Sequence, residues 1–295
     1  MKREKNRFLP LGKSNVPASG SGRLYSVLSP PFDNRAQLSQ HRIGPPKPAL
    51  TGRPGASTTS NLTSRAVSWG RLGTSTPTHS CSTTRSAAFE ICRKRGFKVM
   101  AHANNPDAVK NAIRLGAHSI EHGYIMDDEC IALLVEHQTW YVPTLAISHL
   151  TASQATNEFE ADWVAQRGLS PALCCRAEAA SDVHATWFRK ALDAGVRMAL
   201  GSDIRPLKEA ALLEMGLWVR DGATPWQTLV GATRHAAAVC GVGAELGTVE
   251  VGKLADLIVV GANPLENITN VRRLQLVLKE GRLVSDKRHV SHAVP

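Results

Sequence analysis

From residue 87 to residue 241, short apolar segments alternate with patterns typical of amphipathic helices, and this alternation restricts the possible folds more than any other feature of the chain. Strands are predicted at four apolar segments: 97–103, 118–123, 140–145 and 196–203. Strands that alternate with helices form parallel sheets joined by right-handed crossovers. The sequence therefore predicts an α/β region, a parallel sheet or a barrel, over residues 87–241.

The predicted helices carry start and stop signals. In the stretch PDAVKNAIRLG, Pro106 lies near the first turn and Gly116 ends the helix. The stretch TPWQTLVGATRHAAAVCG has Thr224 as N-cap, Pro225 as the first helical residue and Gly241 as its end. Further helices are predicted from about Ala87 to Gly96, over 127–138, over 207–222 and over a longer stretch that ends at 195.

After Gly241 the apolar period falls to two, which is typical of strands. The segment KLADLIVVGANP, residues 253–264, is predicted as a strand. The segment LQLVLKEGRLV, residues 274–284, is predicted as a hairpin that turns between Lys279 and Gly281. Residues 242–295 are therefore expected to form a small terminal β-unit with a tail.

Residues 1–86 differ in texture from the rest of the chain. They are rich in Ser, Thr, Pro, Gly and Arg, and they show no sustained period of 2 or 3.6. Such a segment buries too little apolar surface to offset the entropy of ordering, so we expect it to be disordered or only locally structured. It also holds 13 Lys/Arg against 2 Asp/Glu, whereas residues 87–295 hold 22 against 23. Because these basic residues are scattered rather than clustered, nucleic-acid binding is not predicted.

The cysteines and apolar runs restrict the compartment. None of the six cysteines forms a C-x-x-C pair, so neither a zinc finger nor a redox motif is predicted. The sequence contains no run of 18 apolar residues, so no membrane span is predicted. No apolar segment typical of a secretion signal follows MKREKNR. We therefore expect reduced thiols and a cytoplasmic location.

Metal-competent side chains stand at three of the four predicted strand ends: His102 in MAHA, His122 in IEHG and Asp203 in GSD. The carboxyl ends of parallel strands meet at one edge of a sheet or barrel, where active sites lie. Imidazole nitrogens and a carboxylate are ligands that a zinc-like ion accepts. Taken singly, each residue has a structural alternative. His102 can be a strand-terminal histidine with a local hydrogen bond, His122 can cap a loop, and Asp203 can cap the next helix.

The stretches VMAHANNPDAVKNAIRLGAHSIEHGYIMDDECIALLVEHQTWYVPTL, AGVRMALGSD and ELGTVEVGKLADLIVVGANPLENI resemble the amidohydrolase superfamily, in its imidazolonepropionase-like and Xaa-Pro dipeptidase-like branch. The resemblance covers about residues 87–285. It implies part of a TIM-type (β/α)8 barrel, strands 5–8, followed by remnant strands of a C-terminal β-sandwich. His102 matches the metal ligand on strand 5, His122 the ligand on strand 6, and Asp203 the strand-8 aspartate.

The reaction implied by this resemblance is the hydrolysis of an amide or other C–N bond in a small amide, dipeptide or cyclic amide. A divalent metal, expected to be zinc, activates the water, and Asp203 is the expected catalytic residue that carries the proton. Tyr124 and Arg205 follow two of the ligand strands and are candidates to hold a substrate carboxylate. The alternative is that both are solvated loop residues. A deaminase of the same superfamily is a further alternative.

The chain also departs from the family pattern. The His-x-His of strand 1 is not found, since His41 and His79 stand alone, and no lysine between Lys47 and Lys94 can serve as the strand-4 lysine. The abrupt join near Ser86 is typical of a frameshift, a misannotated start or a fused unrelated exon. We therefore expect a truncated and impaired enzyme, or an inactive remnant or interaction fragment. Half a barrel would also leave two open sheet edges, which predicts dimers or aggregates.

Overall fold

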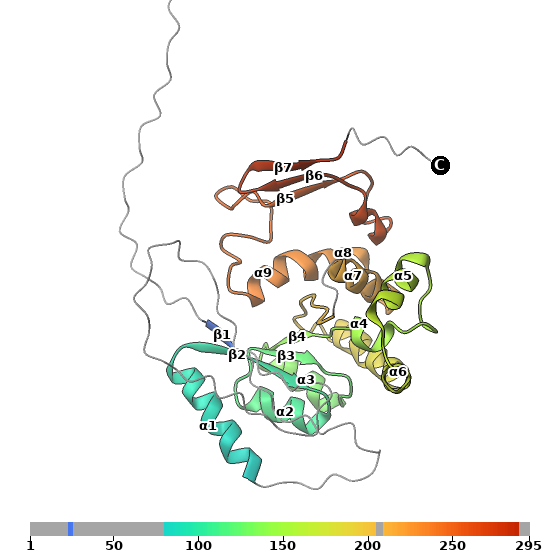
Figure 1. Ribbon diagram of the computed structural model, residues 1–295. Coiled ribbons are helices and arrows are strands. Elements are labelled where there is room, and N and C mark those ends of the chain that lie inside the picture. The colour runs from blue at the N-terminus through green and yellow to red at the C-terminus, as the bar shows by residue number, and fades with distance from the viewer. Residues whose placement is uncertain (1–22, 26–79, 205–208, 289–295) are drawn as a thin grey trace, which may run out of the picture.

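The computed structural model describes residues 23–25, 80–204 and 209–288 (Figure 1). Strands and helices alternate in the first part of the described chain. They are β1 (Arg23–Tyr25), α1 (Ser80–Lys94), β2 (Phe97–Ala103), α2 (Pro106–Arg114), β3 (Ser119–His122), α3 (Asp128–Glu136) and β4 (Trp140–Val142). Helices then follow: α4 (Ala146–His149), α5 (Glu158–Arg167), α6 (Pro171–Asp193), α7 (Ala210–Arg220), α8 (Pro225–Val230), the π-helix η1 (Gly231–His235) and α9 (Ala236–Val239). The remaining elements are β5 (Leu257–Val260), the 3₁₀-helix η2 (Ile268–Arg272), β6 (Leu274–Lys279) and β7 (Arg282–Asp286).

A parallel sheet with the order β1-β2-β3-β4 forms the first half of the fold. Every residue of β3 and β4 is buried. Helices α2 and α3 lie together along one side of this sheet (Figure 1). The α/β prediction and the first three predicted strands are therefore confirmed, with β2 ending at Ala103 as expected.

Local cap chemistry explains where the crossover helix α2 lies. The Asn105 side chain accepts a hydrogen bond from the Ala108 amide, and Pro106 begins the helix. Buried apolar side chains then recur at Val109 and Ile113, four residues apart, and so face the sheet. The predicted start near Pro106 is confirmed.

The predicted helix over 224–241 is confirmed as the continuous run α8–η1–α9. Thr224 and Gln227 form a capping box at its start. The π turn begins at Gly231, where an added Cβ would lie 2.8 Å from the ring of Trp218. Glycine at this position therefore permits a close contact between this helix and α7.

The long helical stretch predicted to end at 195 divides into α4, α5 and α6. Gly168, in the left-handed region at φ 62°, ends α5, and Pro171 begins α6.

None of the described helices combines the length and the apolarity that crossing a bilayer requires.

The prediction of a fourth strand over residues 196–203 is wrong. Only Met198 pairs with the sheet, through an isolated parallel bridge to Tyr141. β4 is only three residues long, so it offers little backbone for pairing. The amide of Leu200 bonds the carbonyl of Gly231 instead, and the left-handed backbone of Asp203, φ 46°, turns the chain. This segment thus follows the rim of the sheet as a loop.

Within residues 1–86 the structure describes local order at two places. α1 begins at Ser80 rather than near residue 87, and β1 pairs in parallel with residues 97–99 of β2. Neither feature was predictable from the sequence. A three-residue strand is too short to show a period, and the first turns of α1, SCSTTR, have no apolar stripe. Part of the β2 edge that was expected to be open is therefore paired. The rest of the prediction for 1–86 lies outside the described residues.

A three-stranded antiparallel sheet, β5-β6-β7, forms the end of the described chain. Glu280 and Gly281, both with positive φ, turn the hairpin between Lys279 and Arg282, as predicted. Figure 1 shows this sheet on the far side of α8 and α9 from the parallel sheet. The C-terminal β-unit is therefore separated from the parallel sheet by helices.

Candidate metal centre

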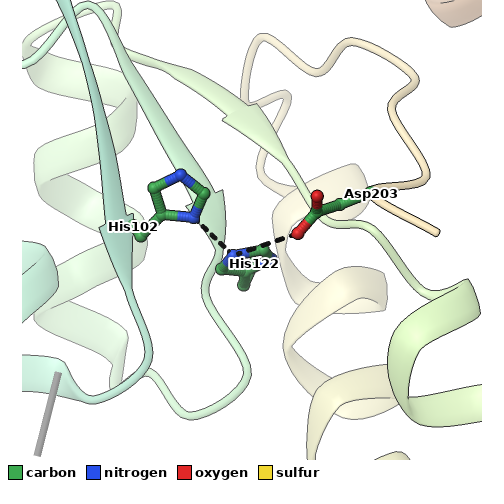
Figure 2. A group of neighbouring side chains, drawn as sticks. All are labelled: His102, His122 and Asp203. Atoms are coloured by element: carbon green, nitrogen blue, oxygen red, sulfur yellow. Dashed lines mark hydrogen bonds and ion pairs between the residues drawn. The ribbon is translucent and has the colours of Figure 1, made fainter. Parts of the chain in front are cut away.

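His102, His122 and Asp203 meet at the carboxyl edge of the parallel sheet. Their potential ligand atoms all lie within 4.8 Å of one another. Figure 2 shows His122 between the other two side chains, with its Nε2 atom 2.6 Å from Nδ1 of His102 and 3.9 Å from Oδ2 of Asp203. The structure thus brings together the three residues that the strand ends suggested.

The register of the sheet and the local backbone place these side chains. β2 and β3 pair in parallel, with Ala103 opposite His122. His122, the last residue of β3, is left-handed at φ 75°, and Asp203 is left-handed at φ 46°. Left-handed backbone is uncommon outside glycine and costs about 1–3 kcal/mol, so the surrounding structure must enforce it. The chain therefore turns sharply at His122 and at Asp203, where each side chain enters the site.

Burial keeps both histidines neutral near pH 7. Loss of solvent lowers the pKa of His102 to about 4. Burial, and then repulsion from the ring of His102, lowers the pKa of His122 to about 3. Neutral imidazoles are the form that binds metals, and Asp203, whose side chain is half-exposed, supplies a carboxylate beside them.

The hydroxyl of Thr144 fixes the ring of His122. Its Oγ1 atom lies 2.8 Å from Nδ1 of His122, which leaves Nε2 directed toward the other two side chains. A hydrogen bond to the distal nitrogen is the usual support of a metal-binding histidine. Two neutral imidazoles and one carboxylate on a shared centre therefore fit a divalent metal ion.

The structural alternatives for these residues are only partly realised. The ring of His122 does bond a loop residue, Thr144, but through the nitrogen that faces away from the site. Asp203 does not cap the next described helix, because Glu209 occupies the N-cap position of α7.

Residues 53–284 match the model of the amidohydrolase family. The chain belongs to this family. An ochratoxinase from Aspergillus niger is 31% identical over 172 residues, which are 58% of this chain and 34% of that protein. An imidazolonepropionase from Treponema denticola is 28% identical over 202 residues, which are 65% of this chain and 42% of that protein.

Among solved structures, a Xaa-Pro dipeptidase with bound methionine in its active site is similar, with a TM-score of 0.59 and 30% identity. The match covers 68% of this chain and 48% of that one. The resemblance to the amidohydrolase superfamily and its α/β metal-hydrolase fold is therefore confirmed. This amidohydrolase chain spans less than half of each of these three relatives. The family match begins at residue 53, inside the segment predicted to be irregular.

Of the two candidate substrate-binding residues, Tyr124 is placed at the site and Arg205 lies outside the described residues. The ring of Tyr124 stacks on His122 with 5.3 Å between centroids and meets His184 edge-on at 4.8 Å. Burial raises the pKa of the Tyr124 hydroxyl, so it remains protonated and can donate a hydrogen bond. It is therefore a buried wall of the site rather than a solvated loop residue.

Arg167, at the end of α5, was not predicted as a site residue, because no sequence pattern marks it. Its guanidinium is half-buried, and Nη1 lies 3.4 Å from the carbonyl oxygens of Ala146 and Leu150. Its charge acts on Tyr124 and Asp203, which places this cation beside the candidate metal centre.

Proposed function

We propose that this centre is a zinc site for the hydrolysis of amide or peptide-like C–N bonds. The observation that carries the proposal is the convergence of two neutral histidines and a carboxylate at the carboxyl edge of the sheet, in a chain of the amidohydrolase family. His102, His122 and Asp203 would hold the metal ion. Support for zinc comes from the mixed nitrogen and oxygen donors.

A bound zinc ion would lower the pKa of a water molecule and polarise the substrate carbonyl. The chain's own residues would provide the remaining chemistry. Asp203, with its half-exposed carboxylate, would accept the proton of the attacking water and donate it to the leaving nitrogen. Thr144 would hold the ring of His122 in one orientation throughout.

We further propose a small amide, dipeptide or cyclic amide with a carboxylate as the substrate. Tyr124 would donate a hydrogen bond to this group, and Arg167 and Arg205 are the candidate cations for it. The half-buried guanidinium of Arg167 supports the proposal, because a cation withdrawn from water is stabilised by an anionic partner.

The missing family residues limit the activity expected of this chain. Its sequence has neither the strand-1 His-x-His nor a lysine between Lys47 and Lys94. If its described α/β part corresponds to barrel strands 5–8, with 242–295 as the sandwich remnant, the metal keeps only three ligands. We therefore propose weak, sub-stoichiometric zinc binding and little hydrolysis by this chain alone. A second candidate, an inactive remnant or interaction fragment, rests on the same missing ligands.

Calorimetric zinc titration tests the proposal. The chain should bind less than one zinc ion, and the double variant His102→Ala, His122→Ala should bind at least about tenfold more weakly. His137→Ala is the matched control, because this histidine is exposed on the far end of α3. Equal binding by the double variant and the control would refute the metal site. Tight binding of two ions with turnover would refute the proposed impairment.

A further inference from the structure

A row of four buried hydrogen bonds connects His149, at the end of α4, to the backbone of the candidate ligand His122. The bonds are His149 Nδ1 to Ser148 Oγ (2.8 Å), Ser148 Oγ to His184 Nδ1 (2.8 Å), His184 Nε2 to Tyr141 Oη (3.2 Å) and Tyr141 Oη to the His122 carbonyl (3.0 Å). Beyond the row, Oδ2 of Asp221 lies 2.9 Å from Nε2 of His149 as an ion-pair contact. All of these residues are buried.

The end of the row determines the direction of donation in its last steps. The carbonyl oxygen of His122 can only accept, so the hydroxyl of Tyr141 donates to it. That hydroxyl then accepts from Nε2–H of His184, whose Nδ1 atom is left as an acceptor for the hydroxyl of Ser148. Each hydroxyl donates one bond and accepts another, so Tyr141 and His184 are fixed in a single arrangement.

Ser148, His149 and Asp221 have the composition of a hydrolase triad, but they do not form a second active site. Each is at least 93% buried, so no substrate reaches the hydroxyl of Ser148. The row instead ends at His122, and its effect must be sought there.

Tyr141 contacts the backbone at the sharp turn where β3 ends. His122 and Gly123 are both left-handed, with φ 75° and 57°. An added Cβ at Gly123 would lie 2.8 Å from Cε2 of Tyr141, so the tyrosine ring packs directly against this turn. The same tyrosine bonds the carbonyl of His122. Ring and hydroxyl together stabilise a conformation that an isolated histidine avoids.

We propose that Tyr141, held in place by His184, is a positioning residue for His122. Its ring and hydroxyl keep the backbone left-handed, so that the imidazole points toward the other two candidate ligands. The metal-binding part of this inference rests on the proposed function, whereas the backbone part stands on the metal-free chain.

Hydrogen exchange of the metal-free chain tests the backbone part. The variant Tyr141→Phe keeps the ring and loses the hydroxyl. Exchange of the Gly123 amide, which bonds the carbonyl of Ala103, should become at least about tenfold faster relative to amides in α7. Thr228→Val is the matched control, because it removes a buried hydroxyl that bonds the Thr224 carbonyl far along the chain. Equal exchange at Gly123 in the two variants would overturn the inference.

Cobalt binding tests the effect on the site, because the visible absorption of cobalt reports its ligand arrangement. Tyr141→Phe should bind cobalt about 10–100-fold more weakly than the unsubstituted chain, with an altered spectrum. His184→Leu should have the same effect, and His184→Gln, which retains an N–H donor, should partly restore binding. If the unsubstituted chain binds cobalt and all variants bind it equally with one spectrum, the inference fails. If the unsubstituted chain binds no cobalt, the proposed function fails and the exchange experiment still decides the role of Tyr141.

Discussion

The parallel strands β2, β3 and β4 and the antiparallel strands β5, β6 and β7 are built from similar apolar segments, yet they differ in what covers them. Every residue of β3 and β4 is buried, whereas four of the five residues of β7 are exposed. Crossover connections place helices on the faces of a parallel sheet, but hairpins carry no such cover. An apolar run thus predicts a strand without predicting its burial, and stability should depend on the two sheets very unequally.

The largest expected difference comes from the same substitution in each sheet. Ile120 in β3 is 0% exposed and Ile258 in β5 is 57% exposed. Ile120→Ala leaves a cavity in the core and should lower the free energy of unfolding by about 3 kcal/mol. Ile258→Ala should lower it by less than about 1 kcal/mol. Urea denaturation measures both, and similar losses would show that the C-terminal sheet is buried by a partner.

A smaller difference is expected from two carboxyl groups. Glu214 in α7 is fully buried and accepts hydrogen bonds from the amides of Leu145 and Ala146 at the start of α4, each 2.8 Å long. In Glu214→Gln an NH2 group faces one of these donors, which should cost about 2 kcal/mol of unfolding free energy. Glu266→Gln, at an exposed contact with Asn263 beside the C-terminal sheet, should cost less than about 0.5 kcal/mol. If Glu214→Gln leaves the free energy of unfolding unchanged, α4 does not need these two hydrogen bonds at its start.

The pH dependence of stability should also differ between the region of the parallel sheet and the C-terminal sheet. His102 and His122 have folded pKa values of about 4 and about 3, below the unfolded value near 6.5, so their contribution is lost as pH falls below about 6.5. Relative to the variant His102→Gln, His122→Gln, the chain should lose about 2 kcal/mol between pH 7 and pH 5.5, which is about 1 kcal/mol for each histidine. The variant comparison is needed because burial raises the pKa of Glu121 and Glu214, which gives the opposite slope.

Parallel urea titrations at the two pH values measure this loss. The region 242–288 has no histidine, so substitutions there should leave the pH dependence unchanged. A pH-independent difference between the chain and its double variant would show that the two histidines are not withdrawn from water.

The sequence predicted what local chemistry determines. Caps at Asn105 and Thr224 fix helix starts by bonds to residues three positions away, and the hairpin turn at Gly281 needs only its own backbone. The meeting of His102 and His122 was also predictable, because one strand–helix–strand unit separates them and parallel strands end at one edge.

The rest depends on packing between distant segments, which leaves no local trace. Arg167 looks like an ordinary basic residue at a helix end, and only the fold brings it near Tyr124. The bond between His184 and Tyr141 joins residues 43 positions apart. The segment 196–203 has the composition of a strand, but in the folded chain it pairs with the sheet only through one isolated bridge, at Met198. Sequence reasoning therefore finds the candidate ligands and misses the groups that support them.

The smallest effect on stability is expected at Val284, which is 59% exposed on β7. Val284→Lys removes little buried surface and should change the free energy of unfolding by less than about 0.5 kcal/mol. It should nevertheless reduce self-association in sedimentation velocity, because exposed apolar strands favour pairing between copies and a lysine opposes it. Ala165→Lys adds the same charge at an exposed position of α5 and is the control. If both variants associate like the unsubstituted chain, the C-terminal sheet is no contact surface, and the contrast between the two sheets concerns stability alone.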